Sequence, residues 1–146
     1  MPMRVLFVCT ANAARSQMAE ALLQKAGGDS FDAHSAGTSP HGQVHPLAVR
    51  VLSRVDIDIW GRKPKSIHQF RGQKFDHVIT LADDARDATA AAVVAEETIH
   101  WSVDDPLQDP TELGFIEVMK QLRRRVELFA TVARQRLTPS GHRGDP

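Results

Sequence analysis

The sequence predicts an α/β fold, a three-layer sandwich in which helices flank a four-stranded parallel sheet of strand order 2-1-3-4. Two observations support it. Short apolar segments alternate with segments of helical periodicity, which is typical of a parallel sheet covered by helices. Hydrophobic residues make up 42% of the 146 positions, enough for the core of one domain. We expect that domain over residues 1–138 and a disordered polar tail over residues 139–146.

The first half of the chain supplies two strands and two helices. It predicts strands over residues 4–9 and 31–36 and helices over residues 14–26 and 45–55. The first strand is continuously apolar after Arg4, as in a strand buried on both faces of a sheet. Gly27 and Gly28 end the first helix, and Pro46 suits the first turn of the second.

The second half supplies the remaining strands and helices. It predicts strands over residues 75–81 and 98–101 and helices over residues 83–94 and 111–137. Asp83 and Asp84 favour a helix start, where the helix dipole stabilises acidic side chains. Thr111 can cap the last helix, whose apolar side comprises Phe115, Leu122, Val126, Phe129 and Ala133.

Charge and composition narrow the class of protein. The 18 basic residues balance the 18 acidic ones, so charge indicates neither a nucleic-acid partner nor a membrane surface. The N-terminal apolar run is too short for a signal peptide. One cysteine cannot form an internal disulfide, which favours a reducing cytoplasm. The seven histidines lack the paired spacing of zinc ligands, so we expect them to be scattered and solvated and expect no bound metal.

The segment CTANAARS, from Cys9 to Ser16, places this cysteine between the first strand and the first helix. Ligands bind at the carboxyl ends of parallel strands, and backbone N–H groups at a turn into a helix bind anions. The guanidinium of Arg15 matches a tetrahedral oxyanion and helps to stabilise a thiolate. We therefore expect a nucleophile in an anion cradle made by Thr10, Ala11, Asn12, Ala13, Ala14 and Arg15. The alternative is a buried structural cysteine before an ordinary helix.

Two neighbours of the cysteine have roles that their chemistry suggests. Ser16 can donate a hydrogen bond to the sulfur, and Asn12 can brace the loop because it tolerates a left-handed backbone. An acidic stretch further along carries Asp104, Asp105 and Asp109. From the residues alone a catalytic acid and an ordinary Asp-Pro turn are equally good interpretations of that stretch.

These residues carry a family resemblance. VLFVCTANAARSQMAEALL resembles the phosphate loop and first helix of the low-molecular-weight protein tyrosine phosphatase superfamily, which includes the phosphatase-like arsenate reductases. HSAGT, DIDIWGRKPKSI, FDHVITLADDA and HWSVDDP are similar to later segments of the same superfamily, so the resemblance covers most of the chain.

The resemblance implies a role for each site residue. Cys9 would be the nucleophile, while Arg15 and the loop amides would hold the oxyanion. Ser16 would hold the thiolate and assist it as leaving group, and Asn12 would fix the loop. Asp105, which precedes Pro106, would protonate the departing oxygen. Ala11 stands where relatives often have glycine, and alanine would strain the loop if that position required a positive φ.

Two reactions share these parts. In phosphotyrosine hydrolysis, Cys9 would attack phosphorus and water would cleave the phosphocysteine. In arsenate reduction, it would attack arsenic, and a thiol would then release arsenite. The phosphatase branch has aromatic residues after its Asp-Pro pair, where this chain has Leu107 and Gln108. Trp60 could line the mouth or could equally be a partly buried packing residue. We favour arsenate reduction and keep the phosphatase as the alternative.

The second thiol would come from outside the chain. Thioredoxin-coupled relatives carry a cysteine where this sequence has Ala82, and Cys9 has no companion elsewhere. The expected reductant is glutathione or mycothiol, with a glutaredoxin-like protein to clear the mixed disulfide. Ala11 and Ala82 also motivate a third hypothesis, an inactive oxyanion-binding regulatory module.

Overall fold

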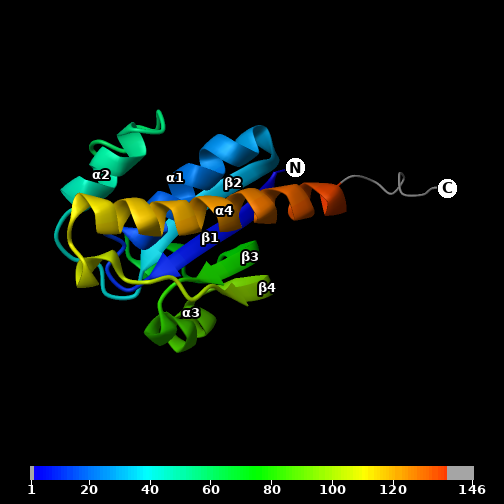
Figure 1. The fold of residues 1–146 in the computed structure, drawn as a ribbon. Helices are drawn as coiled ribbons and strands as arrows, with labels where there is room; N and C mark the ends of the chain where they lie inside the picture. Colours follow the sequence, from blue (N-terminus) through cyan, green and yellow to red (C-terminus); the bar gives the residue numbers. More distant parts are fainter. Residues whose placement is uncertain (1, 138–146) are drawn as a thin grey trace.

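The structure, a computed structural model, describes residues 2–137 and shows one four-stranded parallel sheet. The strands are β1 (Met3–Cys9), β2 (Phe31–Gly37), β3 (Lys74–Thr80) and β4 (Val94–His100). Their order across the sheet is β2-β1-β3-β4, which confirms the predicted topology (Figure 1). The tail expected over residues 139–146 lies outside the described residues.

The central strand β1 explains why the N-terminal apolar run is continuous. Val5, Leu6, Phe7 and Val8 have no exposed surface, because β2 and β3 flank the strand and helices cover its faces. The register sets Cys9 beside Gly37, so the two strand ends open at the same edge of the sheet.

The α-helices of residues 2–137 are α1 (Arg15–Gly27), α2 (Pro46–Ser53), α3 (Arg86–Ala92) and α4 (Glu112–Leu137). The long α4 packs on α1 and α2 (Figure 1). It covers the side of β3 and β4 that carries His77 and Ile99, whereas α3 lies on the side of Val78 and Thr98. The predicted three-layer sandwich follows from this arrangement.

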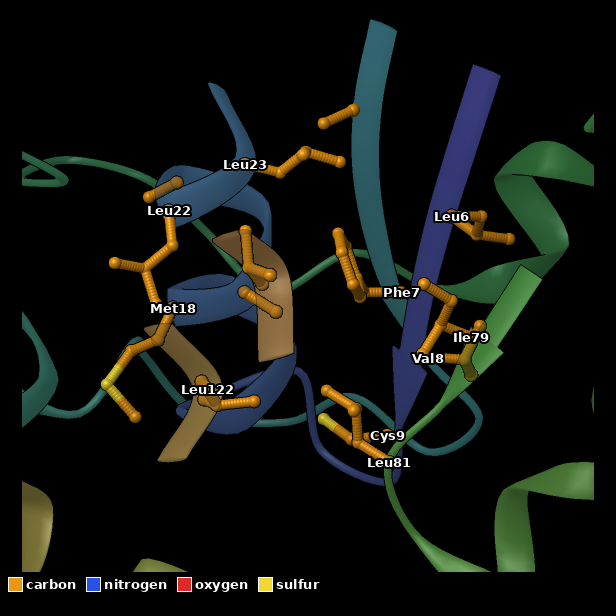
Figure 2. Close-up of a cluster of buried hydrophobic side chains, with 14 of the residues drawn as sticks. Leu6, Phe7, Val8, Cys9, Met18, Leu22, Leu23, Ile79, Leu81 and Leu122 are labelled. Carbon is orange, nitrogen blue, oxygen red and sulfur yellow. The ribbon is translucent and has the colours of Figure 1, made fainter. Parts of the chain in front are cut away.

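The hydrophobic core between β1, α1 and α4 ends at the cysteine. Phe7, Met18, Leu23 and Leu122 are fully buried. Figure 2 shows Cys9 at the lower end of this cluster, next to Leu81. The core therefore holds the strand end that carries the thiol in a fixed position.

The largest differences from the predicted elements lie around β4. This strand begins at Val94, four residues earlier than expected, and the helix expected over residues 83–94 divides into a 3₁₀ turn (Asp83–Ala85) and the shorter α3. β4 is an edge strand whose first five residues are largely exposed, so it carries Glu96 and Glu97 and shows no apolar run. Its start is set by pairing with β3, including the bond from the Val94 N–H to the Gln73 carbonyl.

The predicted cap of the last helix is confirmed, whereas the expectation for the histidines is wrong for one residue. The hydroxyl of Thr111 accepts the Gly114 N–H at 3.0 Å, which confirms the predicted cap. The expectation that all the histidines are solvated is wrong for His77. Its ring is buried against Phe129, and its Nδ1 atom lies 2.9 Å from Glu97 Oε1. The sequence pattern missed this because the partner lies on the next strand.

No three His, Cys, Asp or Glu side chains of residues 2–137 are grouped to hold a metal ion. None of the helices in the same range combines the length and the hydropathy that a membrane span requires.

Candidate active site

The loop between β1 and α1 is held in place by the segment that follows β2. The Thr38 N–H donates to the Cys9 carbonyl at 3.1 Å, and the Ser39 N–H donates to the Thr10 carbonyl at 2.9 Å. The His45 N–H donates to the Ala13 carbonyl at 2.8 Å. These bonds tie three carbonyls of the loop to the segment after β2, while the Asn12 N–H donates to the Cys9 sulfur.

Gly37 permits this close approach. A Cβ atom built on Gly37 would lie 2.5 Å from the Thr10 carbonyl oxygen and 3.0 Å from the Asn12 nitrogen. Both neighbours are backbone atoms of the loop, so no side chain can move aside to make room. The glycine of HSAGT is therefore a packing requirement of the loop.

Cys9 lies at the base of the loop, and the residue is 3% exposed. Ser16 Oγ is 2.8 Å from the Cys9 sulfur, and the Asn12 N–H donates to the sulfur at 3.3 Å. Asn12 has a φ of 56°. Apart from Asp56, it is the only non-glycine residue of the described chain with positive φ, so the strain considered for Ala11 does not arise. Asparagine adopts this conformation more readily than alanine does.

The side-chain amide of Asn12 decides the direction of the hydrogen bonds around the sulfur. Its Oδ1 atom accepts from the Lys65 N–H and from Gln17 Nε2, both at 2.8 Å. Its Nδ2 atom therefore donates, to Ser16 Oγ at 2.6 Å and to Ser35 Oγ at 3.0 Å. The proton of Ser16 is left to point at the Cys9 sulfur, which is the direction that stabilises a thiolate.

Behind the loop lies a carboxylate that the sequence analysis did not identify. Ser35 donates to Glu20 Oε1 at 2.5 Å, and Glu20 is only 8% exposed. Lys65 Nζ lies 3.4 Å from the same oxygen, and Arg62 Nη1 lies 3.7 Å from the other. One signal was present in the sequence, since Ser16, Gln17 and Glu20 are polar residues on the segment of α1 that packs against the sheet.

Arg15 joins three loops at the edge of the sheet. Its Nη1 atom donates to the carbonyls of Leu81 and Val103, each at 3.1 Å, and its Nη2 atom lies 3.9 Å from Asp105 Oδ2. These contacts hold the guanidinium between the cysteine loop and the segments that follow β3 and β4. The first turn of α1 has no side-chain cap and no acidic residue, so its N–H groups remain available to an anion.

The structure distinguishes among the three candidate aspartates. Asp105 Oδ1 accepts the Leu107 N–H at 3.0 Å, which leaves Oδ2 facing Arg15. Asp104 is exposed, and Asp109 accepts from Thr111 in the turn before α4. Cys9, Arg15, Ser16 and Asp105 thus come together at one site, although Asp105 is ninety-six positions beyond Cys9 in the sequence.

The segment around Ala82 is braced on both sides. Thr10 Oγ1 donates to Asp84 Oδ1 at 2.9 Å, so the cradle loop contacts this segment directly. The ring of His100 bridges Thr80 Oγ1 at 2.7 Å and Asp83 Oδ1 at 2.8 Å. Sequence reasoning missed both contacts, because each joins residues from different strand ends.

The expected aromatic lining is sparse. Trp60 is 82% exposed and lies on a groove with Val44, Pro46 and Val49. Leu107 is half-exposed. The one aromatic residue that the sequence offered for this role, Trp60, therefore has most of its surface in solvent.

Comparison with known proteins gives this site a family. The sequence profile named low molecular weight phosphotyrosine protein phosphatase matches residues 4–138. An arsenate reductase from Halalkalibacterium halodurans is 37% identical over 131 residues, which cover 86% of this chain and 94% of the relative.

Solved structures of similar fold include arsenate reductases. An arsenate reductase in a phosphate-binding state has a TM-score of 0.77 and 30% identity, with coverage of 88% of this chain and 97% of that one. A thioredoxin-dependent arsenate reductase from Corynebacterium glutamicum has a TM-score of 0.67 and 27% identity, with coverage of 92% of this chain and 63% of that one. The chain belongs to the low molecular weight phosphotyrosine protein phosphatase family and is an enzyme of that superfamily, either an arsenate reductase or a phosphatase.

Proposed function

We propose that the protein is an arsenate reductase that uses Cys9 as its single nucleophile and an external thiol as its reductant. The observation that carries the proposal is that the loop with Cys9 and Ser16 also carries Arg15, whose guanidinium lies 3.9 Å from the Asp105 carboxyl, in a chain 37% identical to an arsenate reductase. Thr10, Ala11, Asn12, Ala13 and Ala14 would supply the backbone amides of the oxyanion site.

The first step forms a sulfur–arsenic bond without a change of oxidation state. The Cys9 thiolate attacks arsenic, and one arsenate hydroxyl departs as water after it receives a proton from Asp105. Arg15 and the first N–H groups of α1 hold the remaining oxygens. Asp105 Oδ2 suits the acid role because it faces the guanidinium that would hold the substrate.

The second step reduces arsenic. A thiolate from outside attacks the Cys9 sulfur, the sulfur–arsenic bond breaks, and its electron pair leaves with arsenic as arsenite. Cys9 and the external sulfur form a disulfide, so the two electrons gained by arsenic come from two sulfurs. A second thiol, delivered by a glutaredoxin-like protein, then returns Cys9 to the thiolate. The bond from Ser16 supports the sulfur each time it is a thiolate.

The source of the second thiol follows from the cysteine content. Cys9 is the only cysteine of the chain, and Ala82 occupies the position where thioredoxin-coupled relatives have another. We propose glutathione or mycothiol, and a compartment with a reduced thiol pool such as the cytoplasm. Thioredoxin is the reductant named for the Corynebacterium relative, so it forms a separate arm of the test.

A second function uses the same parts. If the substrate were a phosphate ester, water would cleave the phosphocysteine with Asp105 as base, and no second thiol would be needed. The single cysteine favours this alternative, whereas the exposed Trp60 and Leu107 give it little aromatic lining.

The test is arsenite release from arsenate by purified protein. Parallel reactions contain glutathione, mycothiol or thioredoxin, each with its own reducing system, and another contains a phosphotyrosine peptide. We expect arsenite release that needs a small thiol and is lost in Cys9→Ser. Rapid hydrolysis of the peptide without arsenite release would refute the proposal and show that the protein is a phosphatase. Inactivity in every arm, with phosphate still bound, would indicate the regulatory module.

A further inference from the structure

Lys65 lies outside the cysteine loop, yet its N–H, its carbonyl and its ammonium all contact residues of the loop or residues that support the loop. Its N–H donates to Asn12 Oδ1 at 2.8 Å, and its carbonyl accepts the Gly37 N–H at 2.8 Å. Its ammonium lies 3.4 Å from both Glu20 Oε1 and Ser35 Oγ. Lys65 therefore contacts Asn12 in the loop, Gly37 beside the loop and the buried carboxylate of Glu20.

The carboxylate of Glu20 requires such a partner. Its side chain is 10% exposed, and an unpaired buried carboxylate is strongly unfavourable. Lys65 contacts the oxygen that accepts the Ser35 hydroxyl, whereas Arg62 contacts the other oxygen at 3.7 Å. The Lys65 ammonium therefore stabilises the Glu20 carboxylate, which accepts the hydrogen bond from the Ser35 hydroxyl.

The hydrogen bond to Glu20 makes Ser35 an acceptor, which agrees with the direction that the Lys65 N–H and Gln17 Nε2 give to the Asn12 amide. Because Ser35 donates its one hydroxyl proton to Glu20, it acts only as an acceptor toward the Asn12 amide. Asn12 gives its other amide proton to Ser16, and Ser16 gives its own to the Cys9 sulfur. We propose that Lys65 is a positioning residue, whose ammonium holds Glu20 so that Ser35 and Asn12 aim the Ser16 hydroxyl at Cys9.

The proposal rests on the proposed function only in taking Cys9 as the reacting group, so its test avoids arsenate. The rate at which iodoacetamide alkylates Cys9 reports the thiolate directly, and the chain has no other cysteine to react. The same assay with inorganic phosphate reports whether the anion cradle still protects the sulfur.

The variants are Lys65→Met and a matched control, Lys63→Met. Lys63 is an exposed lysine of the same segment, so its loss changes the net charge by the same amount. We expect Lys65→Met to be alkylated about tenfold more slowly near neutral pH, as for the loss of one charge-assisted hydrogen bond. Lys63→Met should react at the wild-type rate.

A rescue experiment separates positioning from general destabilisation. Lys65→Ala leaves space where the ammonium was, and added methylammonium should recover part of the alkylation rate. The same salt should leave Lys63→Ala unchanged. If the single variants do not fold, Glu20→Gln with Lys65→Met removes both charges together, and we expect a folded protein that still reacts slowly.

The proposal would be overturned by wild-type alkylation in Lys65→Met or in the double variant. It would also be overturned by an equal slowing in Lys63→Met, or by the absence of any methylammonium effect on a folded Lys65→Ala. A protein that fails to reduce arsenate but shows the expected alkylation pattern would refute the proposed function and leave the role of Lys65 standing.

Discussion

Replacing Gly37 with alanine should damage the anion cradle far more than the fold. The added Cβ would lie 2.5 Å from the Thr10 carbonyl oxygen, whereas ordinary contact begins near 3.4 Å, so the loop must move by about 0.9 Å. A displacement of about 1 Å at a catalytic group lowers activity by about 10²-fold. Overpacking of this kind lowers the free energy of unfolding by about 1–3 kcal/mol.

Gly27→Ala is the matched control. Its Cβ would meet the Phe31 ring at the far end of α1, away from the loop. Urea unfolding and turnover per folded molecule should be measured for both variants. We expect similar losses of unfolding free energy, with turnover lost only in Gly37→Ala. Full activity in Gly37→Ala, or an equal loss of turnover in Gly27→Ala, would refute this reasoning about the glycine of HSAGT.

Three further predictions concern Asn12 in the loop, the proposed acid Asp105 and the core residue Leu122. Asn12→Ala removes four side-chain hydrogen bonds and places alanine at a φ of 56°, so the free energy of unfolding should fall by about 3 kcal/mol in urea titrations. A wild-type denaturation midpoint would contradict this. Asp105→Asn should lower kcat for arsenate by about 10²-fold while phosphate binding, measured by calorimetry, persists. Asp104→Asn is its control, and an equal loss there would remove the case for Asp105. Leu122→Ala leaves a cavity beside fully buried neighbours and should lower the free energy of unfolding by about 3 kcal/mol, with turnover per folded molecule unchanged. A change in KM for this core variant would show that the core and the loop are more tightly coupled than the packing implies.

Local sequence was sufficient for the elements whose signals lie within a few residues. The apolar run of β1 predicted a strand buried on both faces, and the cysteine, asparagine and arginine of the next turn predicted an anion cradle. The strand inference is confirmed, because strand burial depends on neighbouring residues, and the anion cradle stays a prediction. The start of β4 could not be read in this way, since an exposed edge strand has no apolar pattern and takes its limits from the strand beside it.

The sequence by itself determined the strand order, the position of the single thiol and the residues that could surround an oxyanion. The tertiary structure decided which aspartate faces Arg15, and it assembled the support behind Cys9 from Glu20, Ser35 and Lys65. These residues come from α1, β2 and the segment before β3, and only packing brings them within hydrogen-bonding distance. A single residue type carries little information about such a contact, because its energy exists only when all the partners are buried together.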